Sequence, residues 1–79
     1  TGPAEARVAR LLLFLSSLTT DGRCVDIGRQ DMGALLGITT ETASRVVADF
    51  RRRGLVEETG DGEHCHCNVD ILKQIAHSG

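Results

Sequence analysis

Residues Arg29 to Arg53 read RQDMGALLGITTETASRVVADFRRR and contain two helical patterns separated by a glycine. The first pattern covers residues 29–36. Gly28 can serve as its N-cap, and Gly37 is expected to end it because glycine tolerates the left-handed backbone of a tight turn. We expect the buried face of this helix to consist of Met32, Leu35 and Leu36.

The second pattern covers residues 40–53 and follows Thr39, a favoured N-cap. Two helices joined by so short a turn need a small residue where their backbones approach, and Gly33 supplies it. Ile38 provides a hydrophobic anchor after the turn. The stretch 29–53 therefore predicts a helix-turn-helix, whose second helix has an apolar stripe with spacing i, i+3, i+4 and i+7, formed by Ala43, Val46, Val47 and Phe50.

The segments before this motif predict one helix and one strand. Residues 3–19 have the three- and four-residue apolar spacing of an amphipathic helix, with Pro3 in a first turn that tolerates it. Thr20-Asp21-Gly22 is expected to end that helix, and Cys24 to Ile27 alternate as in a short strand. The expected inward residues of the helix are Val8, Leu11, Leu12, Leu15 and Leu18.

The segments after the motif predict a hairpin and a last helix. Gly54 closes the preceding helix, and residues 55–59 and 64–67 are extended runs that flank a glycine-rich acidic turn. Asn68 is expected to cap a helix over 69–77, with Ile71, Leu72 and Ile75 directed inward.

The predicted fold class is α+β and mostly helical, a winged helix-turn-helix. The element order is helix, strand, helix, helix, strand, strand, helix. We expect a single domain over residues 1–79, with the helix-turn-helix at 29–53 and the wing hairpin at 55–67.

Charge is distributed unevenly along a chain of 79 residues whose net charge is −2. Segment 39–53 carries four arginines against two acids, a net +2, whereas segment 57–70 carries five acids and no Lys or Arg, a net −5. Trp and Tyr are absent. Binding of single-stranded nucleic acid, which usually relies on stacking of bases on aromatic side chains, is therefore disfavoured. A basic helix on an acidic domain favours weak non-specific affinity and binding that depends on geometry and dimerisation.

The outer face of the second helix carries side chains suited to base edges. Arginine reads guanine, glutamate can accept from cytosine, and serine and threonine can do either. The alternative for Glu41 and Arg45 is a surface ion pair at i, i+4 spacing. We expect this face to contact bases in the major groove of double-stranded DNA through Thr40, Glu41, Ser44 and Arg45.

Weaker contacts are expected with the DNA backbone, from Arg29, Thr39, Thr42, Arg51 and Arg52. For Arg51 to Arg53 an alternative stays open, in which they form a solvated helix end that complements the helix dipole.

The motif from Arg29 to Arg45 strongly resembles the C-terminal domain of the CRP/FNR family of transcription regulators, and the resemblance covers essentially the whole chain. Glu41-x-x-Ser44-Arg45 is similar to the FNR branch, which implies TTGAT-like half-sites read by these three side chains. Gly28 departs from the Ser or Thr usual at that position.

The resemblance also implies partners and a missing part. Family members carry an N-terminal effector domain and a dimerisation helix, both absent from this chain, so we expect a homodimer in the full-length protein and no cofactor in this domain. It implies contacts with RNA polymerase through the loop that here is Thr19 to Arg23. Since the chain starts with Thr1, we expect a piece of a longer protein.

The run His64-Cys65-His66-Cys67 contains residue types that bind zinc. On a strand, alternate side chains lie on opposite faces, so the two cysteines share one face and the two histidines the other. A metal or redox site would therefore need Cys24, on the strand expected to pair nearby, together with Cys65 and Cys67. The alternatives are small buried cysteines with solvated histidines, or histidine contacts with phosphates.

Two other function classes are alternatives to DNA binding. A winged helix used only for protein–protein contact is favoured by the net charge and the acidic wing, and disfavoured by the polar outer face of helix 40–53. An enzyme is not expected, because the sequence shows no nucleophile–base pair, phosphate loop or carboxylate dyad. The longest apolar run, Leu11 to Leu15, is too short to span a bilayer, and with no signal peptide visible we expect a cytoplasmic protein.

Overall fold

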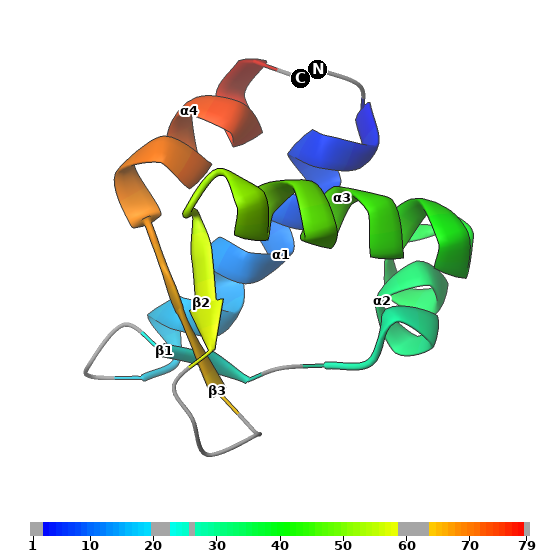
Figure 1. Ribbon diagram of the computed structural model, residues 1–79, viewed down its shortest axis with the longest axis horizontal. Helices are drawn as coiled ribbons and strands as arrows, with labels where there is room; N and C mark the ends of the chain where they lie inside the picture. Colours follow the sequence, from blue (N-terminus) through cyan, green and yellow to red (C-terminus); the bar gives the residue numbers. More distant parts are fainter. Residues whose placement is uncertain (1–2, 20–22, 26, 59–63, 79) are drawn as a thin grey trace.

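The computed structural model describes residues 3–19, 23–25, 27–58 and 64–78 of the chain. Within these residues, four helices and three strands follow one another in the predicted order (Figure 1). The elements are α1 (Pro3–Ser17), β1 (Arg23–Val25), α2 (Arg29–Leu36), α3 (Thr40–Arg52), β2 (Val56–Glu58), β3 (His64–Cys67) and α4 (Val69–Ser78). The winged helix-turn-helix fold is confirmed.

The three strands form one antiparallel sheet with the order β1-β3-β2. The β1–β3 ladder spans three pairs, from Arg23 opposite His66 to Val25 opposite His64. The predicted strand over 24–27 is therefore displaced, because pairing with β3 is available to residues 23–25 and Ile27 lies beyond the ladder. Asp26 of the predicted strand, the predicted helix end at 20–22 and residues 59–63 of the predicted hairpin lie outside the described residues.

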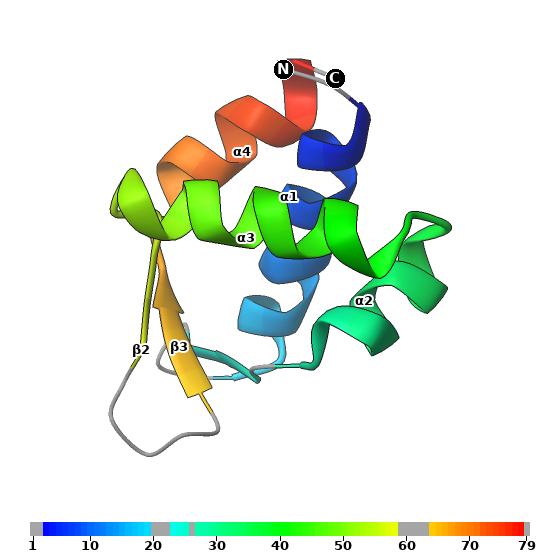
Figure 2. The same cartoon turned by 45° about the vertical axis from the view of Figure 1, so that its right-hand side comes forward.

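The core lies where α1 meets α3, α4 and the sheet, and it is built from aliphatic residues and Phe50. In Figure 2, α3 crosses in front of α1, while α4 lies beside the N-terminal part of α1. The predicted stripe of α3 is confirmed, with Ala43, Val47 and Phe50 buried and Val46 packed against them. The other buried members of this cluster are Val8, Ala9, Leu12, Met32, Leu55, Val56, Leu72, Ile75 and Ala76.

The turn between α2 and α3 depends on two glycines. Gly37 has a φ of 70°, the left-handed conformation expected at the end of α2. Gly33 is buried, and a Cβ added there would lie 2.6 Å from the Ile38 carbonyl oxygen. The backbone after α2 thus passes where a side chain would otherwise be, which confirms the predicted close approach.

The prediction that Leu35 is buried is wrong, since 68% of it is exposed. The buried side of α2 is formed by Met32, Gly33 and the partly buried Leu36. At about 100° per residue, Gly33 lies roughly 60° to one side of Leu36 and Leu35 roughly 100° to the other. The approach at Gly33 therefore turns α2 so that Leu35 faces solvent.

The prediction that Leu18 lies inward is also wrong, since 66% of it is exposed. The helix α1 ends at Ser17, and the next two backbone N–H groups donate to carbonyls three residues back, Leu18 to Leu15 at 3.2 Å and Thr19 to Ser16 at 3.4 Å. Such a tightened last turn takes Leu18 off the helical stripe.

The C-terminus of α3 and the N-terminus of α4 have the capping residues that the sequence predicts. Gly54, with a φ of 74°, follows the C-cap residue Arg53, and the Leu55 N–H donates to the Phe50 carbonyl at 2.9 Å. Asn68 caps α4, its Oδ1 accepting from the Ile71 N–H at 3.3 Å. Within the described residues, no helix has the length and apolar content needed to cross a membrane.

Candidate nucleic-acid interface

The helix α3 divides into a buried side and a solvent side. The apolar stripe of α3 packs into the core, which fixes the rotation of the helix about its axis. Thr40, Glu41, Ser44 and Arg45, predicted to face outward, are all exposed. They occupy the first two turns, the part of α3 that lies next to α2.

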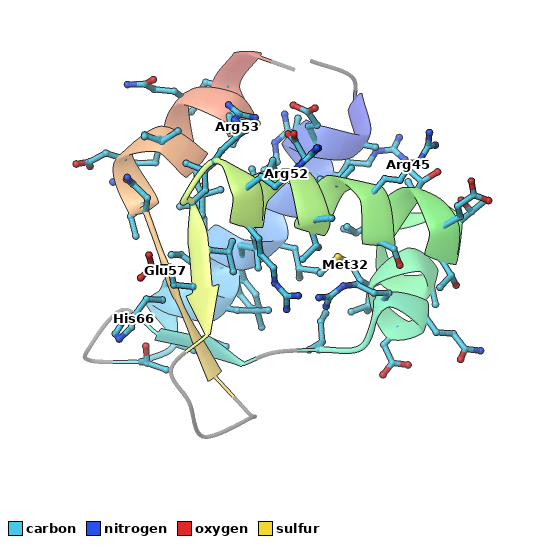
Figure 3. The ribbon with its side chains drawn as sticks, viewed as in Figure 1. Met32, Arg45, Arg52, Arg53, Glu57 and His66 are labelled. Atoms are coloured by element: carbon cyan, nitrogen blue, oxygen red, sulfur yellow. The ribbon has the colours of Figure 1, made fainter. Side chains whose placement is uncertain are left out.

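Arg45 and Glu41 do not form an ion pair in the part of the chain that the structure describes. The side chain of Arg45 extends from the end of α3 near α2, away from Met32, which lies between the two helices (Figure 3). The surface ion pair considered as an alternative is therefore not observed. Both side chains are available to a ligand.

The N-terminus of α3 is closed by two threonines. Thr39 Oγ1 accepts from the Thr42 N–H at 3.0 Å and donates to Thr42 Oγ1 at 2.8 Å. This confirms Thr39 as the N-cap. The two hydroxyl groups are thus hydrogen-bonded to each other, and each retains capacity for one further hydrogen bond.

Arg29, a predicted backbone contact, opens α2 and is partly buried. Its guanidinium donates to the Ile27 carbonyl at 3.2 Å. This bond holds the segment that enters α2, so Arg29 has a structural role in addition to any contact with a ligand.

The three arginines at the end of α3 are not equivalent. Asp49 forms ion pairs with Arg52 at 3.1 Å and with Arg53 at 3.3 Å, at i, i+3 and i, i+4 spacing. Figure 3 shows Arg52 and Arg53 at the opposite end of α3 from Arg45. Because Asp49 compensates part of this charge, the positive end of α3 is less basic than the sequence count of Arg51 to Arg53 suggests. Solvent-exposed pairs of this kind contribute little stability.

Arg7 was missed by the sequence reasoning. From α1 it donates to the Leu36 carbonyl, the last residue of α2, at 3.1 Å. It thereby ties the helix-turn-helix to the rest of the domain. No local signal could have found it, because its partner lies 29 residues away along the chain.

The three-stranded sheet, called the wing sheet below, carries the His-Cys-His-Cys run on its central strand β3. His66 and its register partner Glu57 are both exposed and lie on the wing in Figure 3. Cys67 is partly buried and packs against the core, in agreement with one of the predicted alternatives. The side chains of Cys24, His64 and Cys65 lie outside those described, and the remaining residues contain no group of three potential metal ligands.

Comparison with a family model links the chain to known domains. A model described as the Crp-like helix-turn-helix domain matches residues 6–75. Among characterised proteins, the transcriptional regulator LdrP of two Thermus thermophilus strains is 36% identical over 61 residues, covering 71% of this chain and 31% of the relative. The chain thus spans about a third of the length of these relatives.

Solved structures of known proteins share the fold of this chain. FixK2 from Bradyrhizobium japonicum superposes with a TM-score of 0.77 at 28% identity, over 91% of this chain and 37% of that protein. TTHB099 from Thermus thermophilus, a CRP-family transcriptional regulator, superposes with a TM-score of 0.77 at 28% identity, over 100% of this chain and 43% of that protein. The Thermus thermophilus catabolite activator protein gives 0.75 at 31% identity, over 95% and 34%.

Proposed function

The chain belongs to the family of Crp-like helix-turn-helix domains, and we propose that it binds double-stranded DNA sequence-specifically as the DNA-reading domain of a dimeric bacterial transcription regulator. The role is non-enzymatic and is exercised in the cytoplasm. The transcription regulators among its relatives support this proposal.

The observation that carries the proposal is the division of α3 into two faces. One face is anchored in the core through Ala43, Val47 and Phe50, so the helix is held rigidly. The other presents exposed polar side chains over two successive turns at its N-terminal end. A helix placed in this way by a helix-turn-helix enters the major groove with its N-terminal residues at the base edges.

Each exposed side chain has a partner in that groove. Arg45 can donate two hydrogen bonds to guanine O6 and N7, and Glu41 can accept from the amino group of cytosine. Ser44 and Thr40 can donate or accept. Because Glu41, Ser44 and Arg45 match the pattern of the FNR branch, the half-site proposed is TTGAT-like.

Contacts with the DNA backbone would then fix the register of α3 on the duplex. The Thr42 hydroxyl, Arg51 and Arg52 are the candidates on α3, and Arg29 and Thr39 would contribute in addition to their structural hydrogen bonds.

The net charge of −2 favours weak binding of DNA by a single domain. Two domains, paired through a dimerisation helix outside this chain and spaced about 34 Å apart, would read a palindrome. RNA polymerase is a further proposed partner, through the loop at residues 19–23.

Competitive mobility shifts test the proposal, with a duplex containing a TTGAT palindrome and a scrambled duplex of equal composition. Arg45→Ala is expected to weaken binding to the palindrome by about 1–3 kcal/mol, roughly 5- to 150-fold, and to relax specificity at one base pair. Lys73→Ala is the matched control, since it removes an exposed cation from α4. Equal affinity of wild type and Arg45→Ala for the palindrome would remove the role given to Arg45.

A winged helix that contacts only protein is the second candidate, favoured by the acidic segment 57–70 and the net charge. It predicts no preference between palindrome and scrambled duplex, even at low salt.

A further inference from the structure

Two cysteines lie opposite each other on neighbouring strands of the wing sheet. Cys24 of β1 and Cys65 of β3 are Cα partners in the antiparallel register. They are 41 positions apart in the sequence, so the pairing is created by the fold. Neither residue belongs to the proposed DNA-reading face on α3.

Spacing decides which of the three cysteines can be joined. Directly opposite residues of antiparallel strands have Cα atoms about 4.5–5.5 Å apart, within the roughly 4.4–6.8 Å that a disulfide spans. Cys65 and Cys67 are two residues apart on one strand, about 6.8 Å at 3.4 Å per residue. Cys24 and Cys67 are diagonal neighbours, about 7–8 Å apart. The directly opposite pair lies well within the span of a disulfide, whereas the pair on one strand lies at its upper limit and the diagonal pair beyond it.

The position of Cys67 separates it from this pair. Its register partner is Val56, which is buried, and Cys67 itself packs against the core. The sheet thus offers two cysteines in register and a third held by packing.

We propose that Cys24 and Cys65 form a thiol pair that a hydroperoxide converts reversibly into a cross-strand disulfide. One thiolate attacks a peroxide oxygen, the O–O bond breaks, and the sulfur becomes a sulfenic acid while the departing oxygen takes a proton. The second thiolate attacks that sulfur, the S–S bond forms, and the S–O bond breaks with loss of water. Two thiols and one hydrogen peroxide yield one disulfide and two waters, so the two electrons pass from the sulfurs to the peroxide.

The disulfide would join β1, which precedes the helix-turn-helix, to β3 of the wing. β1 ends at Val25, shortly before α2 begins at Arg29, and β3 is a strand of the wing. Oxidation therefore fastens the strand that leads into the helix-turn-helix to the wing. The closed loop contains about 40 residues, and loops of this length lose substantial denatured-state entropy when they are cross-linked.

The test is peptide mapping of the protein after treatment with one equivalent of hydrogen peroxide, with remaining thiols alkylated before digestion. Trypsin releases Cys24 in the peptide 24–29 but leaves Cys65 and Cys67 together in 54–73, so variants assign the bond. The linked peptide is expected in wild type and in Cys67→Ser, and is expected to be lost in Cys65→Ser. Dithiothreitol should reverse it.

A thermal melt provides a second measurement on the same samples. The oxidised form of wild type and of Cys67→Ser should melt roughly 10 °C or more above the reduced form, whereas Cys24→Ser should show no such shift. The proposal is overturned if peroxide yields only sulfinic acid or dimers linked between chains, or if Cys65→Ser still yields a bond from Cys24 to Cys67.

Discussion

Replacing Gly33 by alanine tests whether the close approach between α2 and the following turn sets the geometry of the helix-turn-helix. The added Cβ would lie 2.6 Å from the Ile38 carbonyl oxygen and 3.3 Å from backbone atoms of Thr39 and Thr40. Ordinary contact starts at 3.4 Å, so the backbone would have to retreat by roughly 0.8 Å.

The magnitude follows from two opposing effects. Overpacking of this kind costs about 1–3 kcal/mol, and alanine returns about 0.5–1 kcal/mol through its better helix propensity. Because the atom at 2.6 Å belongs to the backbone and cannot simply rotate away, the overpacking cost is taken from the upper part of that range, about 2–3 kcal/mol. The net loss is then about 1–2.5 kcal/mol, a large part of the roughly 3–5 kcal/mol that a domain of this size has available. The melting temperature should fall by roughly 4–20 °C.

The assay is thermal denaturation followed by circular dichroism, with Gly28→Ala as the matched control. Gly28 precedes the same helix with a φ of −64°, and a Cβ there meets only the Asp31 carboxylate at 3.9 Å. Since alanine is a poorer N-cap than glycine, the control should lower the unfolding free energy by about 0.5–1 kcal/mol, less than the change expected at Gly33. Equal melting temperatures for Gly33→Ala and Gly28→Ala would refute the reasoning that the approach at Gly33 constrains the motif.

Three further changes have expected outcomes. Gly28→Ser supplies the side-chain oxygen that the N-cap of α2 lacks and should raise the unfolding free energy by a few tenths of a kcal/mol in denaturant titrations, and an unchanged midpoint would contradict this. Asn68→Ala removes the cap of α4 and should lower it by about 1 kcal/mol, which an unaltered melt would disprove. Asp49→Asn frees Arg52 and Arg53 from their ion pairs and should strengthen non-specific DNA binding roughly two- to fivefold at low salt with little change in stability. Unchanged affinity for scrambled duplex would show that these arginines lie away from the DNA.

The helix-turn-helix could be predicted in detail because its signals are local. The helix bounds at 29–36, the caps at Gly28 and Thr39, and the positive φ of Gly37 depend on neighbouring residues. Leu35 was misplaced because apolar spacing alone does not give the rotation of a short helix, which is set here by contact with the turn after it.

Features that depend on distant contacts were beyond sequence reasoning. The bond from Arg7 to the end of α2 and the register that pairs Cys24 with Cys65 arise only when the chain is folded. For the candidate interface, exposure of the four side chains on α3 was predicted correctly from the apolar stripe. Their contacts with bases remain predictions, since hydrogen bonds to DNA involve a second molecule.

Methylation interference with a TTGAT palindrome tests most directly whether α3 reads bases. The half-site contains a single guanine, and a methyl group on its N7 occupies the position where Arg45 would donate. Methylation of that guanine is expected to block binding by the wild type and to have little further effect on the residual binding of Arg45→Ala. Equal binding of methylated and unmethylated sites by the wild type, or equal interference in both proteins, would contradict recognition of this base by Arg45.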